Sequence, residues 1–136
     1  ILCTGLDGEF KSGGIVAIDM TDEAVEPGFA VSESFIGAEI CDFDYANGKF
    51  YVAADSSTAS ELYAVNASAA SKTTLVSYAS AWTMPFVKAN GAGLLLVADR
   101  TLSAPGIRIL DTANDTFTTS GVISTGLPPC DIALTE

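Results

Sequence analysis

Histidine is absent from the 136 residues, which removes the commonest protein ligand of zinc and copper and the usual general base at neutral pH. Basic residues are also few, because six Lys and Arg stand against 17 Asp and Glu, giving a net charge of −11. Nucleic acids and anionic lipids both attract clustered Lys and Arg. We therefore expect no nucleic-acid partner. The chain has no run of about 18 apolar residues, so no membrane insertion is predicted.

Cysteine is scarce as well. Cys3, Cys41 and Cys130 are too few for a disulfide scaffold, and their number is odd. Free thiols that pack as small hydrophobes are one interpretation, and a Cys3–Cys130 bridge is the other. The chain opens at Ile1 without an initiator Met or a leader-like segment, so we expect a processed chain or a fragment.

The sequence contains an internal repeat. Short apolar runs rich in Val, Ile, Tyr and Phe are typical of strands. Three of these runs lead to an Asp, which we call the first marker. Each is followed by a second strand that ends in Asp or Asn, the second marker, 12, 11 and 12 residues later. The marker pairs are Asp7 and Asp19, Asp55 and Asn66, and Asp99 and Asp111. The first marker recurs after 48 and 44 residues and the second after 47 and 45.

Each unit of about 45 residues predicts four antiparallel strands, which is the arithmetic of a β-propeller blade. We expect an all-β fold in which the blade units span roughly 1–35, 36–80 and 81–125, and 126–136 supplies the inner strand of a following blade. The whole chain is then one propeller segment. The expected strands are 1–5, 14–19, 28–32, 39–45, 49–54, 61–66, 73–77, 84–88, 94–98, 106–111, 116–122 and 130–135.

The third unit carries a family resemblance. Residues 107–116 read Ile-Arg-Ile-Leu-Asp-Thr-Ala-Asn-Asp-Thr, and residues 126–133 read Gly-Leu-Pro-Pro-Cys-Asp-Ile-Ala. In order and spacing they resemble the YVTN-type β-propeller repeat. The second unit departs from the pattern with Asn66 in place of Asp and has no Gly-x-x-Pro before Met84. The resemblance implies a blade and no particular chemistry, because the family includes secreted and cell-surface proteins as well as lactonase-like enzymes.

The frame of the repeat is offset, since the chain starts on the second strand of a unit and ends on a first strand. Three blades are not expected to close into a ring by themselves, because propellers typically contain 4–8 blades. We therefore expect half of a six-bladed ring. The partner would be a second copy of the chain or the remaining half of a longer polypeptide.

Two sets of carboxylates are candidate functional groups. Asp7, Asp55 and Asp99 end equivalent strands, where converging oxygens suit a metal such as Ca²⁺; alternatively, each accepts N–H groups of its own loop. The second set is Asp42, Asp44 and Asp131, which lie on expected inner strands. These residues would line the central channel as a hydrated acidic wall, or a neighbouring pair would act as acid and base.

Aromatic residues gather around one link between units, at Tyr78, Trp82 and Phe86, with Met84 among them. They predict either core packing or an aromatic binding spot. No Gly-x-Ser-x-Gly motif occurs, and a Ser or Cys nucleophile would have no histidine to activate it. The sequence therefore favours a non-enzymatic binding or assembly module. A secreted, periplasmic or cell-surface location follows from the resemblance, and the alternative function is a lactonase-like hydrolase with a metal at the channel mouth.

Overall fold

The computed structural model describes residues 1–3, 11–84, 86–118 and 121–135. Within these ranges the chain is all-β, as the sequence predicts, and its strands form antiparallel sheets. In chain order the elements are β1 Leu2–Cys3, β2 Gly14–Ile15, β3 Ile18–Asp19, β4 Ala24–Val25, β5 Val31–Ser32, α1 Glu33–Ile36, β6 Glu39–Ala46, β7 Lys49–Asp55, β8 Ser60–Asn66, the 3-10 turn η1 Ala67–Ala69, β9 Ser71–Tyr78, β10 Val87–Ala89, β11 Leu94–Asp99, β12 Gly106–Asp111, β13 Thr116–Phe117 and β14 Ile123–Ser124.

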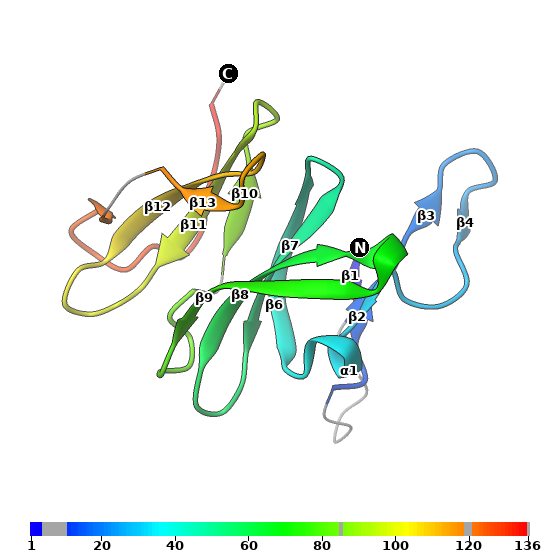
Figure 1. Cartoon of the computed structure of the whole chain (residues 1–136), viewed down its shortest axis with the longest axis horizontal. Coiled ribbons are helices and arrows are strands. Elements are labelled where there is room, and N and C mark those ends of the chain that lie inside the picture. Colours follow the sequence, from blue (N-terminus) through cyan, green and yellow to red (C-terminus); the bar gives the residue numbers. More distant parts are fainter. Residues whose placement is uncertain (4–10, 85, 119–120, 136) are drawn as a thin grey trace.

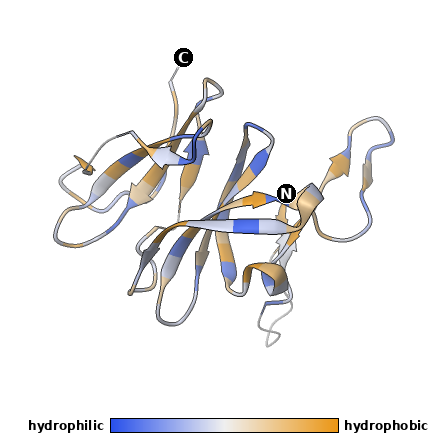
Figure 2. Ribbon diagram, in the orientation of Figure 1, coloured by the Kyte–Doolittle hydropathy of each residue, from blue (hydrophilic) through white to orange (hydrophobic). Residues whose placement is uncertain are grey.

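The central sheet has the order β6-β7-β8-β9 and matches the expected strands of the second unit. Its side chains alternate, so that Val52 and Ala54 pack into one hydrophobic core while Tyr51 and Ala53 pack into another. Figure 1 shows this sheet between β10–β13 on the left and the strands β1 and β2 on the right. In Figure 2 hydrophobic segments run along the strands. Both faces of the central sheet are therefore covered.

The C-terminal sheet has the order β10-β11-β12-β13, and β14 also pairs with β12. Of the strand expected over 116–122, the structure assigns β13 to Thr116–Phe117, and β14 follows just beyond the expected range at Ile123–Ser124. Strand β14 comes very close to β12, since a Cβ at Gly106 would lie 2.0 Å from the carbonyl oxygen of Ile123. Glycine at position 106 permits this close backbone approach.

The N-terminal sheet is smaller than expected. It has the order β1-β2-β5, and the strand expected over 14–19 divides into β2 and β3 because β3 pairs with β4 in a separate hairpin. The strand expected over 28–32 is reduced to Val31–Ser32. The short helix α1, which the sequence did not predict, begins where the Ser32 side chain accepts the amide of Phe35.

The last expected strand is wrong, because residues 130–135 form no strand in the structure. A strand exists only when another strand satisfies its backbone groups, and no described segment pairs with this one. The strand expected over 84–88 is displaced to Val87–Ala89. The sheets that the structure describes do not close into a ring.

Three hairpin turns share one local geometry. Each starts with an Asp or Asn whose side chain accepts an amide of the turn, and four residues later the backbone has a positive φ. These pairs are Asp19 and Glu23, Asn66 and Ala70, and Asp111 and Asp115. The second sequence marker is thus a turn former, because Asp and Asn side chains bind nearby amides more readily than most residues.

Carboxylates join neighbouring sheets. Glu33 of α1 is buried, and its two oxygens accept the amides of Gly13 at 2.8 Å and Ile40 at 3.1 Å. At the other junction, Asp42 and Asp44 of β6 accept the amides of Val87 at 2.9 Å and Ala89 at 2.8 Å. These amides lie outside the ladders of their own sheets, so each carboxylate supplies an acceptor that the sheet does not.

A hairpin tip of the central sheet also contacts the next sheet. Asn47 donates to the carbonyl of Thr112 at 2.9 Å, and the Tyr51 hydroxyl donates to the same oxygen at 3.1 Å. Tyr51 is fully buried, and it also donates to Asp115. The tip is therefore tied to the turn that follows β12.

All three cysteines are free, so the Cys3–Cys130 bridge is not formed. Cys3 and Cys41 are partly buried and Cys130 is exposed. In the part of the chain that the structure describes, no helix combines the length and the apolarity needed to cross a membrane.

The two Asn-Gly pairs differ. Ala46 pairs with Lys49 across Asn47 and Gly48, whose φ values of 49° and 77° fit a tight two-residue hairpin. An Asn-Gly pair between strands predicts a tight hairpin, but at the second pair, Asn90-Gly91, Ala89 pairs with Leu95, which leaves a longer loop. In that loop the Asn90 side chain accepts two amides.

We expect Gly48→Val to lower the free energy of unfolding by about 1–2 kcal/mol, because a β-branched residue at positive φ is strained. Gly48→Asn is the control, since Asn tolerates this conformation and should cost less. Chemical denaturation measures both variants. Equal losses in the two would contradict the turn assignment.

Candidate functional site

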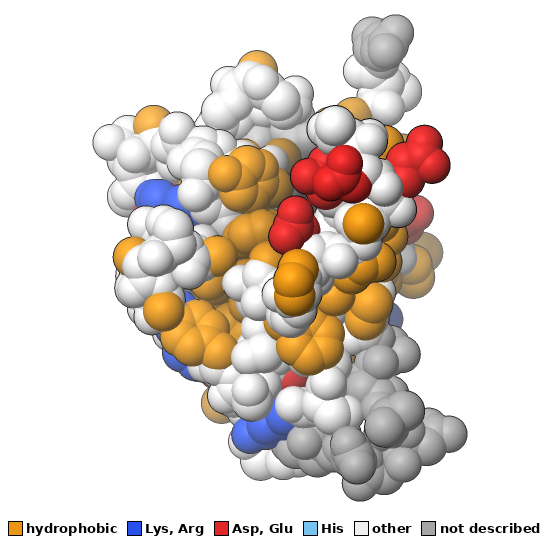
Figure 3. Space-filling view, turned by 90° about the vertical axis from the view of Figure 1, so that its right-hand side faces the viewer, with side chains coloured by type: hydrophobic (Ala, Val, Ile, Leu, Met, Phe, Trp, Pro, Cys, Tyr) orange, Lys and Arg blue, Asp and Glu red, His pale blue; other side chains and the backbone are white. Residues whose placement is uncertain are grey.

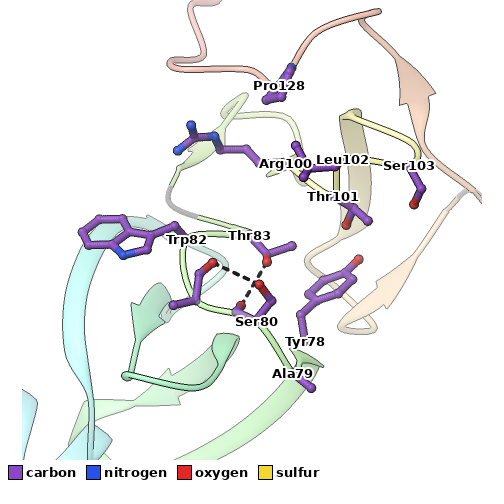
Figure 4. Close-up of a pocket in the computed structure, with 11 residues that line it drawn as sticks. Tyr78, Ala79, Ser80, Trp82, Thr83, Arg100, Thr101, Leu102, Ser103 and Pro128 are labelled. Carbon is purple, nitrogen blue, oxygen red and sulfur yellow. Dashed lines mark hydrogen bonds between the residues drawn. The ribbon is translucent and has the colours of Figure 1, made fainter.

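A pocket of about 590 Å³ lies between the link from β9 to β10 and the loop after β11. Residues 78–83 and 100–103 line it, together with Pro128. Figure 4 shows these segments facing one another across the opening. The volume falls within the roughly 300–1,000 Å³ of small-molecule sites.

Asp55 supports one wall of this pocket. It ends β7 and is 3% exposed. One carboxylate oxygen accepts the Ser60 hydroxyl, and the other accepts the amide of Trp82 at 3.1 Å and the thiol of Cys41 at 3.4 Å. The Ser60 hydroxyl in turn accepts the amide of Thr83 at 2.8 Å. Asp55 thus fixes the link without facing the pocket.

Asp99 supports the opposite wall in the same way. It ends β11 and is fully buried. One oxygen accepts the amide of Thr101 at 2.9 Å, and the other accepts the Tyr78 hydroxyl at 2.7 Å and the Arg108 guanidinium at 2.8 Å. Burial by itself would raise the pKa of Asp99, but the hydrogen bonds from Thr101, Arg108 and Tyr78 outweigh it and lower the pKa.

The two walls are joined directly. The amide of Arg100 donates to the carbonyl of Thr83 at 2.7 Å, so the loop after β11 is bonded to the link. Tyr78, the last residue of β9, reaches across to Asp99. Burial and the neighbouring carboxylate raise the pKa of Tyr78 to about 12, so it stays a neutral donor. The pocket therefore has a rigid frame.

The metal hypothesis places Asp7, Asp55 and Asp99 together. Asp7 lies outside the described residues. The oxygens of Asp55 and Asp99 already accept protein donors, as the alternative of loop-bound carboxylates requires. Among the described residues, no group of three or more Asp, Glu or Cys side chains is placed to hold a metal ion. A Ca²⁺ site that includes Asp7 stays a prediction.

The expected channel residues Asp42, Asp44 and Asp131 are placed differently from one another. Asp42 and Asp44 bind the edge of β10, and Lys88 lies 3.6 Å from Asp44. Burial raises the pKa of Asp42, although the Val87 amide opposes that shift. Asp131 is exposed in a segment without strand structure and accepts its neighbour's amide, that of Ile132. Asp42 and Asp44 therefore serve a junction between sheets, and their role in a channel stays a prediction.

The aromatic cluster divides between core and pocket. Met84 is fully buried in the core between the central and C-terminal sheets. Tyr78 and Trp82 line the pocket. Trp82 is 62% exposed and has a φ of 60°, which is unusual for a bulky side chain. Figure 4 shows its indole extending away from the backbone of the link.

Arg100 is a pocket residue that the sequence reasoning missed. Its Nε atom is buried and has no hydrogen-bond partner among the residues that the structure describes. By contrast, Arg108 pairs with Asp99 and Lys49 pairs with Asp115. A signal was present, because Arg100 is one of only six basic residues and directly follows a repeated marker.

The chemistry of the pocket lining is mixed. Among the described residues it contains hydroxyl, aromatic and guanidinium groups and no carboxylate. Cys41 lies on β6, and its thiol contacts Asp55. Burial and the charge of Asp55 raise the pKa of this thiol to about 12. A thiol with that pKa stays protonated at neutral pH and is a poor nucleophile.

We expect Asp99→Asn to lower the free energy of unfolding at neutral pH by about 2–3 kcal/mol, since it removes charge-assisted hydrogen bonds. Because the folded-state pKa of Asp99 is lowered, its contribution to stability is complete above the ordinary aspartate pKa of 3.8 and is lost as pH falls through the folded-state pKa. Chemical denaturation at a series of acidic pH values should therefore show a free energy of unfolding that falls less steeply with decreasing pH in the variant than in the parent. Asp131→Asn removes an exposed carboxylate as a control, and equal effects would contradict the bracing role.

Trp82→Gly should leave the melting temperature unchanged or raise it, because glycine adopts positive φ freely and the exposed indole buries little surface. Trp82→Val is the matched control, since it keeps and worsens the backbone strain and should melt lower. A marked loss of stability in the Gly variant would show that Trp82 is a packing residue.

Comparison of the chain with protein-family models, with curated proteins and with solved structures gave no match. The resemblance to the YVTN-type repeat therefore stays a prediction. The function has to be argued from the geometry of the chain itself.

Proposed function

We propose that this chain is a non-enzymatic binding module whose sheets are blades of a β-propeller. The observation that carries the proposal is the stacking of three sheets through two similar junctions. Each junction combines a hydrophobic core with a carboxylate that accepts main-chain amides of the neighbouring sheet. Sheets stacked in this manner can continue in both directions.

The turns support the same arrangement. Three turns repeat the pairing of an amide-accepting side chain with a positive φ four residues later. Asp55 and Asp99 end corresponding strands of consecutive sheets, although their contacts differ: Asp55 accepts the amide of Trp82 in the link after its own sheet, whereas Asp99 accepts the hydroxyl of Tyr78 at the end of the preceding sheet. The support for a repeat architecture therefore comes from the recurring turns, because structural repeats reuse one local geometry.

The outer sheets leave apolar surface uncovered. Figure 3 shows hydrophobic side chains across the face on the N-terminal side, with acidic ones at its edge. The exposed large hydrophobic residues of the N-terminal region are Ile1, Ile18, Met20, Val25 and Phe29, and those of the C-terminal region are Ile123, Leu127 and Leu134. Further sheets, from a second copy or from other parts of a longer polypeptide, would cover these faces.

The pocket supports binding over hydrolysis. The described residues of its lining include no carboxylate, and a lactonase-like reaction would need a metal or an acid–base pair. A secreted or cell-surface setting is in keeping with the resemblance and is part of the proposal.

Light scattering on the purified chain tests the assembly. Two copies completing one ring should give a particle of twice the 14.0 kDa chain mass. Introducing a charge at an outer face, as in Val25→Glu, should shift the particle toward monomer, whereas Thr58→Glu in the exposed loop after β7 should not.

A stable monomer of 14.0 kDa that melts cooperatively would contradict the shared ring. In that case the exposed faces would not be interfaces between copies of this chain.

A further inference from the structure

The conformation of Trp82 is not explained by stability. Its indole is 62% exposed, so it contributes little to the core. Its positive φ is disfavoured for a bulky L-residue. The hydrogen bond from its amide to Asp55 holds the backbone in place. Strain of this kind is concentrated at binding sites, where the surrounding structure imposes it.

Arg100 provides a second, independent observation. Its Nε–H donor is buried without a partner, although buried donors are nearly always satisfied. None of the acidic residues that the structure describes lines this pocket. The acceptor that would complete Arg100 is thus not among the lining groups. A guanidinium prefers a carboxylate, which accepts two parallel hydrogen bonds.

The two side chains lie in one pocket. In Figure 4 the guanidinium of Arg100 and the indole of Trp82 extend to the same side of it. Ser80 and Ser103 also line the pocket and carry hydroxyls suited to polar substituents. An aromatic face and a cation in one pocket suit a ligand with a flat apolar face and one negative group.

We propose that this pocket binds a small ring compound that bears a carboxylate. The Arg100 guanidinium donates to the carboxylate, and the ring packs on the Trp82 indole. This inference rests on the proposed function as a binding module, but it requires no assembly into a closed ring.

The experiment uses Trp82 as its own reporter, because it is the only tryptophan of the chain. Its fluorescence is followed while the full chain is titrated with glucuronate, glucose, benzoate and benzyl alcohol. The two acids share the carboxylate and differ in the ring, so they distinguish a sugar ring from an aromatic one. We expect saturable changes with at least one acid and binding at least tenfold weaker for its neutral counterpart.

Arg100→Gln should weaken binding of that acid by about tenfold or more, as expected for loss of a charge-assisted hydrogen bond. Arg100→Lys should fall between Gln and the parent, because it keeps the charge but loses the Nε donor. Lys88→Gln removes a positive charge outside the pocket and should bind as the parent does. Denaturation curves establish that each variant is folded.

The proposal is overturned if neither acid gives a saturable change, if each acid and its neutral counterpart bind equally, or if Arg100→Gln binds as the parent does. These outcomes are independent of the light-scattering result. A monomer that binds the acid would support the pocket proposal and contradict the shared ring. An assembled particle that binds neither acid would support the ring and contradict the pocket proposal.

Discussion

The structure depends on carboxylates that accept main-chain amides where the sheet ladders end. Glu33 does this between the N-terminal and central sheets, and Asp42 and Asp44 do it between the central and C-terminal sheets. A buried amide without an acceptor costs about 1–3 kcal/mol, and a buried carboxylate without donors costs more. The carboxylate therefore accepts the hydrogen bond that the amide must donate, and the amide supplies a donor for the carboxylate. A chain with 17 acidic and only six basic residues has few cations to pair with buried carboxylates, and the amides at the sheet edges supply the missing donors.

The features that the sequence predicted well are local ones. An Asp or Asn side chain reaches amides two or three residues away, so the turns that start at Asp19, Asn66 and Asp111 depend on little beyond their own residues. The long strands of the central sheet were predicted closely because their alternating side chains are buried on both faces. The roles of Asp42 and Asp44 could not be predicted in this way. Strand alternation indicates which face a side chain occupies, but the amides of β10 that cover it come from 45 residues further along the chain.

The wrong predictions lie where a strand depends on a partner. Residues 130–135 have the composition of a strand and find no neighbour to pair with, so they stay irregular. Residues 14–19 pair in two places: β2 joins β1 and β5, while β3 turns outward to β4. The composition of a segment expresses a preference for extended backbone, whereas pairing supplies most of the stability, and pairing is not encoded in the segment itself.

Two kinds of residue surround the pocket: Asp55 and Asp99 stabilise its frame, whereas the side chains of Trp82 and Arg100 do not. The oxygens of Asp55 and Asp99 accept protein donors: those of Asp55 hold the link after its sheet, and those of Asp99 hold its own loop, β12 and the end of β9. Repetition at these positions therefore has a structural cause, and a repeated residue is a poor guide to the ligand. The residues that indicate a ligand are those whose side chains lie in the pocket without stabilising its frame. Trp82 has a strained backbone and an exposed ring, and Arg100 has a buried donor that none of the described groups accepts. Because the frame fixes both segments before any ligand arrives, binding would require little ordering of the protein, and rigid sites of this kind lose less affinity to conformational entropy.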